Sequence, residues 1–143
     1  MIQFLHSNWA ILVLIMFAIT ISKAIFNYLK GKSFKYDTDF RLASFTLIVL
    51  YIQIILGIIS WFSSDYFTGI KNGQMGEFMK QAHSRLIVVE HPLMALIALL
   101  LVHYGFKRIK KNPTSKKKFM SVIIFYGLAF LLILSRIPWS NWF

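Results

Sequence analysis

Three ionisable side chains inside long apolar stretches of the sequence lie at matched distances from basic residues. His6, His91 and Arg136 stand 17, 16 and 18 residues from the nearest lysine at the basic edge of their own stretch. At a rise of 1.5 Å per residue, each separation corresponds to roughly 24–27 Å along a helix. The spacing therefore predicts that the three side chains occupy one layer of a helical bundle.

Histidine and arginine in one such layer suit a haem site. The alternative is that the histidines only hydrogen-bond neighbouring helices, with His6 an interfacial residue at the N-terminus. Neutral imidazoles on two different helices can donate to one iron from opposite sides, and the core of a helical bundle is a common place for such a cofactor. We therefore predict that His6 and His91 are the axial ligands of a single haem b. Arg136 lies slightly further along its helix, where its guanidinium is expected to pair with haem propionates.

Two other histidines and a methionine are the remaining candidates. His83 lies about 12 Å beyond His91 along the helix, and a loop that folds back over the bundle would make it a competing ligand. Met94, one turn from His91, either offers a softer thioether ligand or packs in the core. His103 lies roughly 18 Å from the layer, so its removal is expected to leave a haem spectrum unchanged.

The residues on either side of His91 each have two possible roles. Glu90 projects about 100° away from His91 around the helix, where it either orients another ligand or pairs with Arg136. Pro92 has no N–H, which frees the backbone carbonyl of Val88 one turn earlier. The kink that results either aims His91 or is a detail of packing.

Four apolar runs must position these side chains, and each is long enough to cross a hydrocarbon core about 30 Å thick. Backbone polar groups in lipid need partners within their own segment, so each run is expected to be a helix. The sequence therefore predicts one domain over residues 1–143, an all-α integral membrane four-helix bundle with up-down topology. The expected helices cover residues 4–25, 42–62, 86–106 and 119–137.

Basic residues are distributed unevenly among the connections between these helices. Twelve of the 16 Lys and Arg residues lie in segments 23–41 and 107–118, whereas the connection 63–85 holds three. Because positive loops face the cytoplasm, both termini are expected on the outer face of a bacterial inner membrane. The net charge of +11 is then a topology signal that also attracts anionic lipid, and it does not indicate nucleic-acid binding.

Composition and missing motifs exclude several classes of protein. An apolar content of 57% is too high for a soluble domain of 143 residues. The sequence has no cysteine, which excludes disulfides, iron–sulfur clusters and thiolate zinc sites. It also has no phosphate-binding loop, no credible Ser/His/Asp arrangement and no His-Glu-x-x-His motif, which favours an electron carrier or accessory subunit over a catalyst.

Glycines and tryptophans give further expectations about the bundle. Gly57 and Gly127 stand alone among bulky residues, and at least one is expected to face another helix or a cofactor. The glycines within 69–76 predict a flexible connector.

The four tryptophans of the sequence stand near the outer ends of the expected helices, where an interfacial aromatic belt forms. These residues are Trp9, Trp61, Trp139 and Trp142.

Four short motifs are spread along nearly the whole chain: Leu5-His6-Ser7, Ile52-Gln53 with Gly57, Val89-Glu90-His91 with Met94, and Arg136-Ile137-Pro138-Trp139. Together they resemble motifs of small bacterial four-helix membrane proteins of the cytochrome b-like family. The resemblance implies a haem held through positions 6 and 91, and it adds Gln53 to the candidates for cofactor binding. A looser likeness links the chain to one half of haem A synthase.

Three functions agree with these observations. The first is a b-type haem protein that passes single electrons at the outer side of the membrane, between a quinol and a partner protein. The second is a haem-free accessory subunit of a larger respiratory membrane complex. The third is an enzyme of haem or quinone chemistry. A Soret band in the absorption spectrum of the purified protein would favour the first function over the second.

Overall fold

The structure is a computed structural model that describes residues 1–142, and these residues form helices and short connections without a β-strand. Four helical segments are long and apolar enough to cross a membrane: Ile2–Leu29, Tyr36–Phe62, Ala82–Lys111 and Ser115–Arg136. Each overlaps one of the four apolar runs in the sequence. The prediction of an all-α fold with four membrane-compatible helices is confirmed, and it makes the chain a multi-pass membrane protein.

Shorter helical pieces make up these four segments. The first segment is α1 (Ile2–Leu29), and the second joins the π-helical turn η1 (Tyr36–Phe40) to α2 (Arg41–Phe62). The third consists of α5 (Ala82–Arg85), η2 (Leu86–Glu90) and α6 (His91–Lys111), and the fourth of α7 (Ser115–Ser121), η3 (Val122–Tyr126) and α8 (Gly127–Arg136). The connection between the second and third contains α3 (Asp65–Lys71) and α4 (Met75–Lys80), and η4 (Trp139–Asn141) follows α8.

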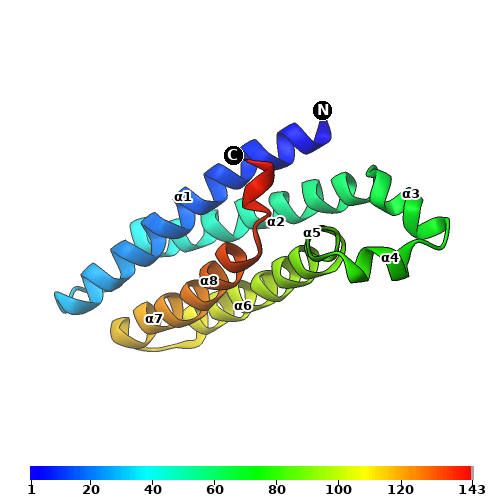
Figure 1. Cartoon of the computed structure of the whole chain (residues 1–143). Helices are drawn as coiled ribbons and strands as arrows, with labels where there is room; N and C mark the ends of the chain where they lie inside the picture. Colours follow the sequence, from blue (N-terminus) through cyan, green and yellow to red (C-terminus); the bar gives the residue numbers. More distant parts are fainter. Residues whose placement is uncertain (143) are drawn as a thin grey trace.

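Neighbouring segments run in opposite directions along the bundle (Figure 1). α1 packs mainly against α2, and α6 packs mainly against α8 and η3. The α1–α2 and α6–α7 connections lie together at one end, and we call this lysine-rich end the basic end (Figure 1). α3 and α4 lie at the opposite end, and the chain after Arg136 leaves α8 and crosses toward α1 (Figure 1).

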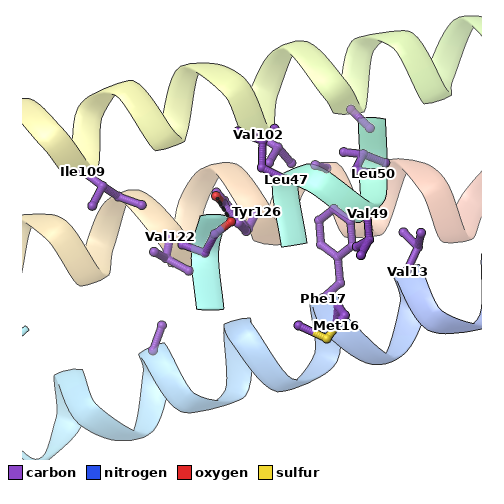
Figure 2. Packing of buried hydrophobic residues seen from close by; sticks show 14 of the residues in the cluster. Val13, Met16, Phe17, Leu47, Val49, Leu50, Val102, Ile109, Val122 and Tyr126 are labelled. Atoms are coloured by element: carbon purple, nitrogen blue, oxygen red, sulfur yellow. Dashed lines mark hydrogen bonds between the residues drawn. The ribbon is translucent and has the colours of Figure 1, made fainter. Parts of the chain in front are cut away.

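Aromatic and branched side chains fill the centre of the bundle (Figure 2). Phe17 and Tyr126 are fully buried there. The Tyr126 hydroxyl donates a hydrogen bond to the carbonyl of Ala43 at 2.9 Å, so its polar tip is satisfied. The hydroxyls of Thr20 and Thr46 share a buried hydrogen bond of 2.7 Å that joins α1 to α2.

Large apolar side chains also cover the outside of the bundle. On α6, Leu93, Leu96 and Leu100 are 48%, 46% and 68% exposed, and Ile11 and Ile15 on α1 are about half exposed. An apolar surface that follows a helix for several turns marks contact with an apolar medium. With four membrane-compatible helices in the fold, lipid is the medium that this surface suits.

The connection between α2 and α5 contains the glycine-rich segment 69–76, which the sequence predicts to be a flexible connector. In the structure this segment joins two short helices: positions 69–71 end α3, positions 72–74 form a turn, and positions 75–76 begin α4. A Cβ at Gly69 would lie 2.6 Å from Cζ of Phe78, so the two helices pack closely at this glycine. The Ser64 hydroxyl accepts a hydrogen bond from the N–H of Phe67 and caps the start of α3.

Gly105 and Gly127 form a matched pair for testing helix packing. A Cβ at Gly105 would lie 2.6 Å from Cβ of Phe125, whereas one at Gly127 would meet nothing within 4 Å. We expect Gly105→Ala to destabilise the fold by about 1–3 kcal/mol, because the added methyl group pushes α6 away from η3. Gly127→Ala should be neutral or should stabilise by up to about 1 kcal/mol. Unfolding of the two variants in mixed micelles measures both effects, and equal effects would contradict the close α6–η3 contact.

Candidate functional site

His6 and His91 meet inside the bundle, away from the basic end. His6 lies near the start of α1, and His91 is the first residue of α6. Their ring centroids are 6.2 Å apart, and the ring planes stand at 84° to each other. The two histidines that the residue spacing assigns to one layer are therefore neighbours in space.

A cavity of about 560 Å³ surrounds the two histidines. Its volume falls within the range of ligand and cofactor pockets, about 300–1,000 Å³. Most of the lining is apolar and comes from several helices, with Val13, Ile54 and Ile133 among the residues that contribute. The last described residue, Trp142, also lines the cavity, so the segment after α8 forms part of its wall.

His91 is held in one orientation by the end of α8. Its Nδ1 lies 2.9 Å from the carbonyl oxygen of Arg136. Because a carbonyl only accepts hydrogen bonds, Nδ1 must carry the proton, so Nε2 of the neutral ring keeps its lone pair. The carbonyl is available because α8 ends at Arg136: Ile137 is extended, as is typical of a residue that precedes a proline.

Pro92 and Trp61 shape the backbone next to His91. Pro92 follows His91 and cannot donate to the carbonyl of Val88, as the sequence predicts. The indole N–H of Trp61 donates to that carbonyl instead, at 3.2 Å. The preceding turn is the π-helix η2, and such turns often occur at functional sites. Trp61 thus has a specific hydrogen bond across the α2–η2 contact in addition to its place in the aromatic belt.

Gly57 and Gln53 on α2 position His6. A Cβ at Gly57 would lie 3.0 Å from Cε1 of His6, so glycine leaves space for the imidazole. This confirms the expectation that at least one of Gly57 and Gly127 faces another helix, and Gly57 is that residue. The amide nitrogen of Gln53 donates to the His6 carbonyl at 3.2 Å and lies 3.4 Å from His6 Nε2.

Two buried polar atoms at this site have no hydrogen-bond partner within residues 1–142. They are Nδ1 of His6 and Oε1 of Gln53. Buried polar groups usually have a hydrogen-bond partner, so an unpaired donor or acceptor next to a cavity indicates a missing ligand or water. Both residues line the cavity described above.

Glu90 lies between two arginines. Its two carboxylate oxygens are 2.9 Å from Nε of Arg85 and 3.4 Å from Nε of Arg136. Of the two roles that the sequence leaves open for Glu90, the structure shows the pair with Arg136. Arg85 is an additional partner that residue spacing does not predict. The three residues, together called the charged cluster, link the third helical segment to the end of α8.

The other candidate ligands do not line the cavity. His83 is exposed on α5, and neither it nor Met94 is among the residues that line the cavity. His103 lies nearer the basic end and shares a hydrogen bond of 2.7 Å with the Tyr51 hydroxyl. The Tyr51–His103 pair could not be predicted from the sequence, because residue counting gives the depth of a side chain along its own helix but not the direction in which it points.

No protein-family model, curated protein or solved structure matches this chain. The assignment of a function therefore rests on the geometry of the site. Within residues 1–142, no group of three or more His, Cys, Asp or Glu side chains is placed to hold a metal ion. The cavity offers two imidazoles, which suit a metal that brings its other ligands with it, as the iron of a haem does.

Proposed function

We propose that the chain binds one haem b between His6 and His91 and transfers single electrons through it. The proposal rests on the two imidazole rings, whose centroids are 6.2 Å apart beside a cavity of cofactor size. The imidazoles of His6 and His91 would hold the haem iron, because neutral imidazoles on facing helices of a bundle suit haem ligation.

The surroundings of the imidazoles suit this role. The Arg136 carbonyl fixes the His91 ring with Nε2 unprotonated, and such a second partner orients a ligand and raises its basicity. Gly57 makes space for His6, and the apolar lining limits the access of water. When bound, haem supplies reversible one-electron chemistry whose potential depends on its ligands and on nearby charge.

The charged cluster supports the same proposal through its electrostatics. It combines two arginines with one glutamate, which leaves one net positive charge next to His91. A nearby positive charge favours the reduced form of a haem, because reduction removes one positive charge from the iron. We also propose that the Arg136 guanidinium, which has five N–H donors in all, donates to a haem propionate.

The distribution of lysine and arginine supports a cytoplasmic basic end in a bacterial inner membrane, with both termini outside. Reporter fusions at Asn112, between α6 and α7, and at Asn72, between α3 and α4, test this orientation. We expect a phosphatase that works only outside the cytoplasm to be active at Asn72 and inactive at Asn112. The reverse result would place the haem layer on the cytoplasmic side.

Haem content is the direct test of the proposed function. Protein purified in mild detergent from cells supplied with a haem precursor should contain about one haem per chain, because two axial ligands serve one iron. Reduction should produce the narrow bands of a six-coordinate, low-spin haem. A matched His83→Ala variant should give the same spectrum. Purified protein without a Soret band, whose titration with haemin gives only the spectrum of free haemin, would contradict the proposal and favour a haem-free accessory subunit.

A further inference from the structure

A second polar pair lies on the lipid-facing surface of the bundle, nearer the basic end than the haem layer. The Tyr51 hydroxyl on α2 and Nδ1 of His103 on α6 are 2.7 Å apart. Tyr51 is 39% exposed, and large apolar side chains one turn away are more exposed still: Ile48 and Ile55 beside Tyr51, and Leu100 beside His103. A polar pair that is surrounded by exposed apolar side chains faces the hydrocarbon of the membrane.

The depth of the pair limits what can bind it. Tyr51 lies ten residues from Arg41, roughly 15 Å along α2, and His103 lies four residues from Lys107, roughly 6 Å along α6. These two distances place the pair roughly 6–15 Å from the basic residues at the edge of the bundle, among exposed apolar side chains of both helices. Polar groups exposed at that depth are costly unless they have partners. Among residues 1–142, the second ring nitrogen of His103 makes no hydrogen bond, so the pair retains hydrogen-bonding capacity.

We propose that Tyr51 and His103 bind the headgroup of a lipid-soluble quinone or quinol. A 1,4-quinone carries carbonyl acceptors and a quinol carries hydroxyl donors, on a ring with an apolar tail. A phenol and an imidazole side by side can donate to the first and accept from the second. The flat ring would lie against the exposed isoleucines and Leu100, and its tail would remain in lipid. The role of the quinol as an electron donor rests on the haem proposed above. The binding of the quinone or quinol at Tyr51 and His103 does not.

Photoaffinity labelling with an azido-benzoquinone that bears a decyl tail tests this site in the full-length protein in vesicles. We expect label on peptides that contain Tyr51 or His103, and we expect unlabelled decyl-benzoquinone to compete in a saturable way. Loss of one hydrogen bond should weaken competition about 5- to 10-fold in Tyr51→Phe and in His103→Leu. Tyr104→Phe is the matched control, because Tyr104 is a half-exposed tyrosine next to His103, and it should bind as the unmodified protein does.

Three results would overturn the quinone site. They are labelling that does not saturate, equal competition constants in all four proteins, and equal competition by a fatty acid of the same chain length. Thermal unfolding of each variant shows that it is folded, and the haem spectrum is recorded on the same samples. An intact spectrum without quinone binding would reject this site alone, and quinone binding without haem would reject the haem proposal alone.

Discussion

Replacement of His91 by alanine is expected to abolish haem binding. His91 is oriented by the Arg136 carbonyl and lies 6.2 Å from His6, and Met94 one turn along does not line the cavity. Loss of the group that hydrogen-bonds a ligating histidine typically lowers metal affinity about 10- to 100-fold. Loss of the ligand itself should therefore lower haem affinity at least about 100-fold. Haem retained per chain after detergent purification measures the effect.

The His6→Ala variant makes the same test from the other side of the cavity. It should retain some haem through His91, in a five-coordinate, high-spin form with weakened affinity. His83→Ala is the control, because His83 is exposed on α5 away from the cavity. Full haem content with an unchanged low-spin spectrum in His91→Ala would contradict the assignment of that ligand.

Replacement of Gly57 by valine is expected to disturb the site without removing a ligand. Its Cβ would lie 3.0 Å from Cε1 of His6, and the two additional methyl groups would push the imidazole from its place. We expect a change from low-spin to high-spin haem and a loss of affinity of about 10-fold or more. Haemin titration followed by absorption gives both quantities.

Gly127→Val is the matched control for this experiment. It introduces the same side chain into an apolar helix, at a position where a Cβ would meet nothing within 4 Å. It should leave the spectrum and the affinity unchanged. If the two valine variants behave alike, Gly57 is not a specific support of His6.

The length of the apolar runs was enough to predict the four helices, and residue counting was enough to bring His6 and His91 together. Both inferences use distances along a single helix, which the rise per residue fixes. The partners of these residues depend on how each helix is rotated about its axis, which one sequence does not give. For this reason the Arg136 carbonyl beside His91 and the Tyr51–His103 pair became visible only in the structure.

At the basic end, too, the sequence does not show which side chains are partners. Lys23 pairs with Asp39 at 2.9 Å, and the Asn27 amide donates to the same carboxylate at 3.1 Å. The second Asp39 oxygen accepts from the N–H of Lys35 at 2.8 Å. In the sequence, Lys23 and Lys35 carry only a topology signal. A count of charges does not reveal that Asp39, which is only 7% exposed, closes the α1–α2 connection.

The central claim is that His6 and His91 together hold one haem. Absorption spectra of the unmodified protein and of the His6→Ala/His91→Ala double variant, purified side by side after growth with a haem precursor, test it most directly. We predict a low-spin b-type spectrum, with about one haem per chain, for the unmodified protein and no bound haem for the folded double variant. A low-spin haem spectrum of normal intensity in the double variant would contradict the account.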